Sequence, residues 1–324
     1  MLRDRFGRTI EYLRLSVTDR CDLRCTYCMP TGFKDFEEPA DWLTFDEIER
    51  LLAAFARLGT RRVRLTGGEP LLRRHVTSLA ARIAAIDGID DLSMSTNATQ
   101  LARHAAALRE AGVRRINVSL DTLDRACMRN ITGRDSHAAV MAGIMAGREA
   151  GFELIKINMV AMRGVNDGEI ERMAEFCIEH GFVLRLIEVM PMGATGRNTA
   201  YLDLQEVQAR LKERFDLVPQ ALELGGGPAR YLATRDGRSS IGFITPMSQH
   251  FCATCNRVRL SVDGTLYLCL GQEEKFEFRP LLRGGASDAE LEAAIREAIE
   301  LKPQKHDFTA RPEKIIRFMS QTGG

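Results

Sequence analysis

The chain has 324 residues, a length that suits about two domains or a single α/β barrel. Its composition, 45% hydrophobic and 27% charged, is that of a folded globular protein and excludes a disordered or collagen-like chain. The 45 basic and 44 acidic residues leave a net charge of +1, which excludes the overall basic field of a nonspecific nucleic-acid binder. There is no signal-peptide core and no apolar run of the ~20 residues that a membrane span needs, so we expect a cytoplasmic protein without a membrane or nucleic-acid partner.

From residue 12 to about residue 190, short β-branched segments alternate with amphipathic helical segments, which predicts βα units around a parallel sheet. The predicted strands are 12–17, 62–65, 91–95, 115–120, 154–160 and 183–189. The predicted helices between them are 45–58, 72–86, 101–111, 137–150 and 168–179. Six units are two short of a full barrel, so we predict an α/β fold with an incomplete (β/α)6 TIM-type barrel.

The alternation stops after Pro191. A helix is predicted at 204–215, a glycine-rich break follows at 225–228, and short strands are predicted near 229–234 and 239–244. We therefore expect two domains: a barrel of residues 1–200 and a C-terminal α+β region of residues 201–324 that covers its open side.

Six of the eight cysteines fall into two groups of three, and the other two, Cys127 and Cys177, are interpreted as core thiols. The first trio, Cys21, Cys25 and Cys28, follows the first predicted strand, where barrel enzymes carry active-site residues. Three thiolates at this spacing can bind one small metal cluster. A structural zinc ion normally needs a fourth Cys or His nearby, and this loop has none.

The segment Cys21-Asp22-Leu23-Arg24-Cys25-Thr26-Tyr27-Cys28 resembles the CxxxCxxC signature of radical S-adenosylmethionine enzymes. The resemblance implies that the trio binds a 4Fe–4S cluster whose open iron chelates S-adenosylmethionine, the source of a 5′-deoxyadenosyl radical. Thr66-Gly67-Gly68-Glu69-Pro70, by itself an ordinary strand-to-helix turn, resembles the GGEP segment of the same family. The S-adenosylmethionine contacts that the family implies are Tyr27, Gly68, Glu69, Ser119 and Met190.

The second trio is Cys252, Cys255 and Cys269. Asp263-Gly264 lies between two β-rich runs and predicts a hairpin with a two-residue type I′ turn. In that register Val262 faces Thr265 and Cys269 lies opposite Val258, so Cys269 returns to the neighbourhood of Cys255. A zinc ribbon with His250 as fourth ligand is the alternative from these residues alone.

The segment 251–259, Phe-Cys-Ala-Thr-Cys-Asn-Arg-Val-Arg, resembles the MoaA family of GTP 3′,8-cyclases of molybdenum cofactor biosynthesis. The resemblance implies a second 4Fe–4S cluster that binds guanine, and abstraction of the ribose C3′ hydrogen of GTP to give 3′,8-cyclo-7,8-dihydro-GTP. It also implies a MoaC-type cyclic pyranopterin monophosphate synthase as pathway partner and a possible homodimer. The alternatives are a peptide-modifying radical enzyme with an auxiliary cluster and a non-catalytic zinc or iron–sulfur protein.

A triphosphate needs local cations, and the chain has no GxxxxGK[ST] loop. An arginine within a barrel strand points either into the lumen or into the helix layer, and only the lumen can hold a ligand. The GTP contacts that the family implies are Arg14, Arg64, Ser95, Lys156, Arg257, Val258 and Arg259, with Arg62 as a further candidate. Arg257 and Arg259, two apart and so on one face of the hairpin, are also the catalytic candidates for the reduction step. The Gly323-Gly324 tail is implied to enter the active site.

Overall fold

The computed structural model describes residues 1–324 except 31, 37–38, 221–223 and 324. Its centre is a curved sheet whose first six strands lie side by side in sequence order and run parallel. These strands are β1 (Tyr12–Ser16), β2 (Arg62–Thr66), β3 (Asp91–Thr96), β4 (Arg115–Ser119), β5 (Leu154–Ala161) and β6 (Val183–Glu188). The predicted incomplete barrel is therefore confirmed, and each predicted strand lies within about one residue of its expected place.

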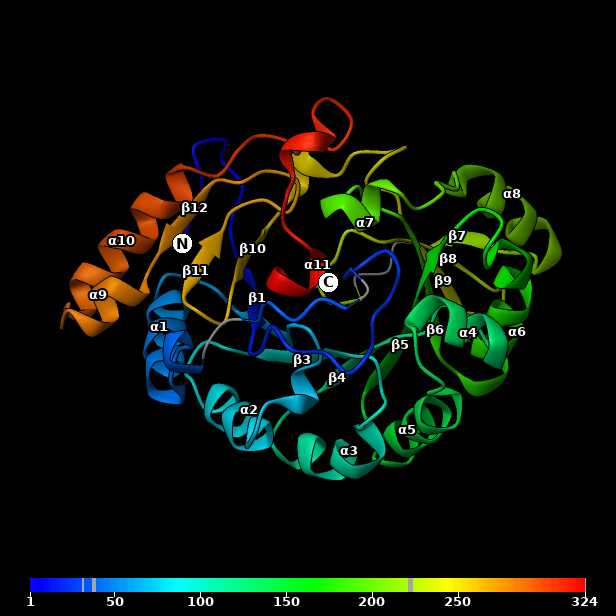
Figure 1. Cartoon of the computed structure of the whole chain (residues 1–324), viewed down its shortest axis with the longest axis horizontal. Helices are drawn as coiled ribbons and strands as arrows, with labels where there is room; N and C mark the ends of the chain where they lie inside the picture. Colours follow the sequence, from blue (N-terminus) through cyan, green and yellow to red (C-terminus); the bar gives the residue numbers. More distant parts are fainter. Residues whose placement is uncertain (31, 37–38, 221–223, 324) are drawn as a thin grey trace.

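Helices cover the outside of this arc (Figure 1). They are α1 (Phe45–Arg57), α2 (Val76–Ala84), α3 (Leu101–Glu110), α4 (Arg125–Thr132), α5 (His137–Glu149) and α6 (Ile170–His180). The helix predicted for 72–86 starts later than expected, because the chain first forms a 3-10 turn at Pro70–Leu72 and then passes through His75 with a φ of 59°. Helix α4 was not predicted, although Asp124 caps its start and Gly133 ends it in the left-handed region.

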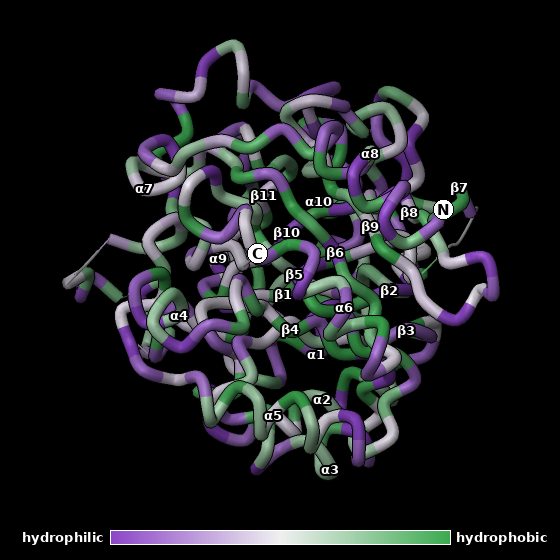
Figure 2. The backbone as a smooth tube through the Cα atoms, turned by 90° about the vertical axis from the view of Figure 1, so that its right-hand side faces the viewer, coloured by the Kyte–Doolittle hydropathy of each residue, from purple (hydrophilic) through white to green (hydrophobic). Residues whose placement is uncertain are grey.

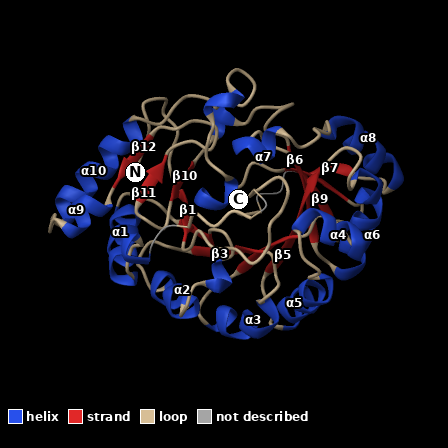
Figure 3. Cartoon of the chain, in the orientation of Figure 1, coloured by secondary structure: helices blue, strands red, loops and turns tan. Residues whose placement is uncertain are grey.

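The C-terminal part of the chain extends the sheet at both edges. Its strands are β7 (Val218–Gln220), β8 (Arg230–Ala233), β9 (Ser240–Ile244), β10 (Arg257–Leu260), β11 (Thr265–Tyr267) and β12 (Lys275–Glu277). Strand β10 pairs parallel with β1, and β9 pairs parallel with β6, so the order is β12-β11-β10-β1-β2-β3-β4-β5-β6-β9-β8-β7 (Figure 3). The strands of both predicted domains thus form one sheet, while the proposed division at residue 200 stays a prediction.

Five further helices complete the described part of the chain: α7 (Gly193–Arg197), α8 (Leu204–Arg214), α9 (Arg279–Arg283), α10 (Asp288–Glu300) and α11 (Met319–Thr322). Helix α10 was not predicted, although Ser287 and Glu290 form the capping box that marks such a start. Helix α11 lies near the centre of the barrel (Figure 1).

The predicted register of the cysteine hairpin is wrong by one residue. Leu260 pairs with Leu266, and the ladder closes with Ser261 N–H donating to the Thr265 carbonyl at 2.9 Å. Three residues therefore form the turn, and only the last, Gly264, has a positive φ, of 88°, whereas a type I′ turn needs two such residues. The Ser261 and Asp263 side chains accept the Thr265 N–H and stabilise the longer turn.

The two faces of the barrel strands differ in polarity. Leu13, Leu15, Val63, Leu65 and their counterparts on neighbouring strands are buried in one hydrophobic core beneath the helices. The alternate residues face the lumen and are largely polar. Figure 2 shows hydrophobic backbone in the interior and hydrophilic segments along the rim. No helix among the described residues is long and apolar enough to cross a membrane.

Candidate active site

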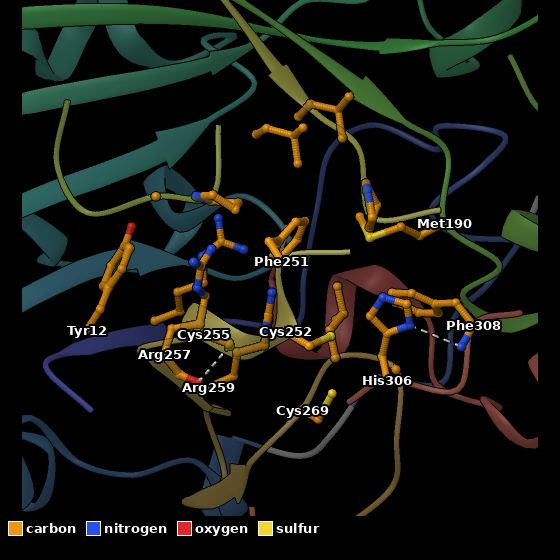
Figure 4. A pocket seen from close by; sticks show the side chains of 18 of the residues that line it. Tyr12, Met190, Phe251, Cys252, Cys255, Arg257, Arg259, Cys269, His306 and Phe308 are labelled. Carbon is orange, nitrogen blue, oxygen red and sulfur yellow. Dashed lines mark hydrogen bonds between the residues drawn. The ribbon is translucent and has the colours of Figure 1, made fainter. Parts of the chain in front are cut away.

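The first of two neighbouring cavities, the cation cavity, lies between β10 and the barrel strands and has an empty volume of about 960 Å³, counting space open to solvent. All three cysteines of the second trio line it, together with His306, Phe308 and Tyr12 (Figure 4). Five arginines also line it: Arg14, Arg64, Arg185, Arg257 and Arg259.

The arginines of the cation cavity are held close together, and none of them forms an ion pair with a carboxylate of the described residues. Burial, reinforced by repulsion from neighbouring arginines, lowers the pKa of Arg14 to about 9 and that of Arg64 to about 10. The Nε atoms of Arg14, Arg257 and Arg259 are buried and have no hydrogen-bond partner among the described residues. No described residue lining the cavity is an Asp or a Glu. Cations arranged in this way are an anion site, because a bound anion would supply both the missing charge and the missing acceptors.

Arg185, which was not among the predicted contacts, belongs to the same group. It lies on β6, and its guanidinium donates to the side-chain oxygens of Asn158 at 2.8 Å and Asn117 at 2.5 Å. Burial and the nearby Arg64 lower its pKa to about 10. An arginine inside a predicted strand was the signal that indicated Arg14 and Arg64, and the same signal was present at position 185.

Lys156 is 1% exposed and lies next to this group without lining either cavity. Its Nζ donates to the Leu224 carbonyl at 2.5 Å. Burial, together with Arg185 and Arg64, lowers the pKa of Lys156 to about 6. Without a nearby anion, this amine is therefore largely uncharged near neutral pH, and a bound anion would favour its protonated form.

The second trio has cationic surroundings. Burial raises the pKa of the Cys255 thiol, but the charges of Lys302 and Arg257 outweigh that effect, and the pKa falls to about 7. Cys269 lies close enough to interact with Cys255 and Lys302. His250, the fourth ligand of the zinc alternative, instead contacts His306, with 3.3 Å between Nδ1 and Nε2.

The second cavity, the first-trio cavity, contains Cys21, Cys25 and Cys28 and has an empty volume of about 1040 Å³ on the same measure. The predicted S-adenosylmethionine contacts Tyr27, Gly68, Ser119 and Met190 also line it, and so does Ser95, which was predicted to contact GTP. The Tyr27 hydroxyl donates to Asp121 at 2.8 Å. Burial and neighbouring thiols hold the pKa of Cys25 well above its usual range, which favours a thiol unless a metal replaces the proton.

The paired glycines after β2 allow close approach of the cysteine loop. A Cβ on Gly68 would lie 2.2 Å from the Arg20 carbonyl oxygen, and one on Gly67 would lie 2.2 Å from that of Thr18. The Gly68 N–H donates to Thr18 at 2.9 Å, and the Glu69 N–H donates to Arg20 at 2.8 Å. The glycines thus help to position the loop of the first trio, whereas from the sequence they were expected only to let a ligand approach the backbone closely.

Glu69 is fully buried and does not line the first-trio cavity. Its carboxylate accepts hydrogen bonds from the Thr96 hydroxyl at 2.7 Å and from the Asn97 N–H at 2.6 Å. Burial nevertheless raises its pKa to about 7. The carboxylate therefore ties the end of β3 to the GGEP turn, and its predicted contact with S-adenosylmethionine stays a prediction.

The two cavities share a wall, formed by Asn158, Ile187, Met190 and Met319. Met319 belongs to α11, so the C-terminal tail lines both spaces. Gly323 packs against Thr66, and a Cβ there would lie 2.3 Å from the threonine Cγ2. The predicted insertion of a side-chain-free tail agrees with this contact for Gly323, while Gly324 lies outside the described residues.

Three other predicted residues are placed differently. The Val258 side chain is 1% exposed and belongs to the hydrophobic core, so its predicted contact with GTP cannot come from its side chain. Arg62 pairs with Glu11 at 2.9 Å and does not line the cation cavity. Cys177 is the predicted core thiol, but Cys127 is only half-buried, with its Sγ 3.6 Å from the Val165 carbonyl.

The cysteine chemistry of both trios fits iron–sulfur clusters. Each trio lines one cavity that has room for further ligands. Among the described residues, no group of three His, Cys, Asp or Glu side chains is arranged to hold a single metal ion. A cluster makes a different demand, because each thiolate binds a separate iron.

Comparison with known proteins agrees with this geometry. Residues 15–177 match the model of the radical SAM superfamily, and residues 182–308 match that of Molybdenum Cofactor Synthesis C. The crystal structure of Streptococcus suis SuiB bound to S-adenosylmethionine has a similar fold, with a TM-score of 0.64 at 16% identity over 90% of this chain and 68% of that one. The fold and the first trio thus define a radical S-adenosylmethionine protein.

Curated relatives narrow the assignment. The GTP 3′,8-cyclase of Paracoccus denitrificans is 47% identical, with 100% of this chain and 96% of the relative covered. The GTP 3′,8-cyclase of Ectopseudomonas mendocina is 45% identical, with 100% and 98% covered. The chain belongs to the GTP 3′,8-cyclase family.

Proposed function

We propose that the protein converts GTP to (8S)-3′,8-cyclo-7,8-dihydroguanosine 5′-triphosphate in molybdenum cofactor biosynthesis. The observation that carries this proposal is the cation cavity, where five arginines lie beside three cysteines and no Asp or Glu among the described residues lines the space. A triphosphate would supply the negative charge and the hydrogen-bond acceptors that the arginines lack. A nucleobase could bind the open iron of a cluster held by the cysteines beside them. The relatives named GTP 3′,8-cyclase support the same substrate.

We assign the first trio and the second trio to one 4Fe–4S cluster each, and S-adenosylmethionine to the first-trio cavity. When bound there, the cluster and S-adenosylmethionine supply hydrogen abstraction by a 5′-deoxyadenosyl radical. Gly68 and Ser119 border that space, and Tyr27 is fixed by its hydrogen bond to Asp121. Because the two cavities share a wall at Met190, molecules bound in them would be neighbours.

The residues of the cation cavity bind and orient the triphosphate. Arg14, Arg64, Arg257 and Arg259 provide guanidinium groups whose planar donors fit phosphate oxygens. Lys156 holds a proton at Nζ once the anion is present, because the anion offsets the burial that lowers its pKa. We assign to Arg257 and Arg259 a second role, stabilising the negative charge that develops on the substrate during its reduction.

The test uses anaerobic, cluster-loaded protein with S-adenosylmethionine, a chemical reductant and GTP. We expect 5′-deoxyadenosine release that depends on GTP, about eight irons per chain and no stoichiometric zinc. Cys269→Ala should keep the first cluster, and so about four irons, while losing cyclisation. Release triggered by a peptide and not by GTP would contradict the substrate, and stoichiometric zinc without iron would contradict both assignments.

We also propose that a MoaC-type cyclic pyranopterin monophosphate synthase consumes the product and that the protein forms a homodimer. A coupled assay with that synthase should yield cyclic pyranopterin monophosphate. Light scattering should give twice the 36.2 kDa mass of the chain. A monomer at all concentrations would contradict the dimer without affecting the reaction.

A further inference from the structure

The loops that carry the second trio are fastened by three buried cations that come from other parts of the chain. Arg8 lies in the N-terminal segment, Lys302 follows α10, and Arg317 precedes α11. All three have less than a tenth of their surface exposed. Each donates to backbone carbonyls at or next to one of the cysteines, and none was indicated by the sequence interpretation.

Arg8 holds the start of the trio. Its Nη1 donates to the Cys252 carbonyl and to the Gln304 carbonyl, both at 2.9 Å, and its Nη2 donates to the Pro303 carbonyl at 2.7 Å. Its Nε pairs at 2.6 Å with Asp4, whose side chain is fully buried. The planar guanidinium therefore fixes the Cys252 loop against the segment after α10.

Lys302 holds together the open ends of the hairpin formed by β10 and β11, which Cys255 precedes and Cys269 follows. Its Nζ donates to the carbonyl of Arg257 at 3.0 Å and to that of Leu268 at 2.5 Å. Arg257 is two residues after Cys255, and Leu268 immediately precedes Cys269. Burial lowers the pKa of Lys302, and the charges of Cys255 and Cys269 oppose that effect, so negative charge at the trio favours the ammonium form.

Arg317 holds the end of the trio. Its Nη2 lies 3.3 Å from the carbonyl oxygens of both Cys269 and Leu270, and its guanidinium lies over the Tyr267 ring, 4.1 Å from the centroid. Glu273 pairs with its Nε at 2.8 Å. Cation–π contact and hydrogen bonds together give this arginine one defined orientation.

The first trio has different surroundings. The charges that face its thiols are mainly carboxylates: Asp22 and Glu69 near Cys21, and Asp121 near Cys25 and Cys28. A cation, Arg24, also acts on Cys21, and it donates to the Cys21 carbonyl at 2.6 Å within the same loop. The described residues thus place negative charge around one trio and positive charge around the other.

We propose that Arg8, Lys302 and Arg317 are positioning residues that hold the second trio in the shape its cluster requires and stabilise the negative charge of the bound cluster. The proposal rests on the proposed function, because it needs the second trio to bind iron. One-electron reduction adds a negative charge to the cluster, and a nearby cation favours that charge. The second cluster should therefore be easier to reduce with these cations than without them.

The test variant is Lys302→Met, which keeps the length of the side chain and removes its charge and donors. The control is Lys305→Met, three residues further on and exposed. Both are made in full-length protein, and again with Cys21, Cys25 and Cys28 replaced by Ala so that only the second cluster remains. Iron per chain is measured, and the midpoint potential of the remaining cluster is followed by electron paramagnetic resonance in a redox titration.

We expect Lys302→Met to shift the midpoint potential of the second cluster to a more negative value, and Lys305→Met to leave it unchanged. Selective loss of about four irons, with the first cluster's signal and the far-UV spectrum kept, would equally support a positioning role. For Arg317→Lys, which keeps the charge but loses the planar fork, we expect lower iron occupancy at an unchanged potential. Unchanged iron and potential in Lys302→Met would overturn the proposal. These readouts need no turnover, so GTP-dependent deoxyadenosine release remains a separate test of the function.

Discussion

Replacing Arg14 by methionine should move stability and substrate affinity in opposite directions. Arg14 lines the cation cavity, its Nε is buried without a partner, and Arg259 repels it. A buried donor without a partner costs about 1–3 kcal/mol, so its removal should stabilise the ligand-free protein by about that amount. For a chain of 324 residues, that corresponds to an increase in Tm of about 1.5–4.5 °C.

The same substitution removes a charge-assisted hydrogen bond to the triphosphate, worth about 1.5–3 kcal/mol, and should weaken GTP binding about 10- to 150-fold. Anaerobic scanning calorimetry and isothermal titration calorimetry on cluster-loaded protein measure the two effects. Arg172→Met, on the exposed side of α6, is the control and should change neither. A lower Tm combined with unchanged affinity would refute the view that the clustered arginines destabilise the ligand-free protein and bind the triphosphate.

Four further predictions concern other parts of the site. Because the pKa of Lys156 is about 6 in the empty site, GTP binding at pH 8 should take up about one proton, whereas binding below pH 5 should take up almost none. Calorimetry in buffers of different ionisation enthalpy measures this uptake, and its persistence in Lys156→Met would exclude that lysine as the acceptor. In the ligand-free protein the unfolded lysine binds more protons than the folded one above about pH 6, so this group's contribution to stability should increase as the pH rises from there. Gly68→Ala should lower the affinity for S-adenosylmethionine, measured by equilibrium dialysis, at least tenfold, because its Cβ would collide with the Arg20 carbonyl. The control Gly168→Ala, where nothing lies within 4 Å of the added Cβ, should leave this affinity unchanged. Equal affinities in the two variants would contradict the clash. Gly323→Ala should displace the tail from Thr66 and speed amide hydrogen exchange at Met319–Thr322. Gly151→Ala has the same φ of 73° but open space around it, so exchange in this helix should not change. Equal exchange rates in the two variants would argue against the Thr66 contact.

The sequence was most informative where local patterns determine the structure. The alternation of apolar and polar residues located all six barrel strands, because burial of one face repeats every second residue. The same alternation placed Arg14 and Arg64 in the lumen. The hairpin turn was harder to predict, because Asp-Gly also suits a three-residue turn, and the hydroxyl of Ser261 favoured that form.

Residues that act from a distance could not be predicted in this way. Arg8 and Cys252 are 244 positions apart, and Arg257 and Lys302 are 45 apart. No local periodicity connects such pairs. The parallel pairing of β10 with β1 brings the segments of Arg8 and Cys252 together, and α10, which packs on α1, leads the chain to Lys302. The prediction that the Val258 side chain contacts GTP was wrong for the opposite reason. Side chains alternate along a strand, so when Arg257 and Arg259 face the cavity, the residue between them must face the core.

The wall shared by the two cavities has a thermodynamic consequence. Met319 and Met190 line both cavities. A ligand in one cavity that fixes either side chain therefore changes the binding free energy of the ligand in the other cavity. Such a coupling is reciprocal: if GTP tightens the binding of S-adenosylmethionine by some factor, S-adenosylmethionine must tighten the binding of GTP by the same factor. One short helix at the end of the chain therefore links the occupancy of two sites that the protein builds from different parts of its sequence.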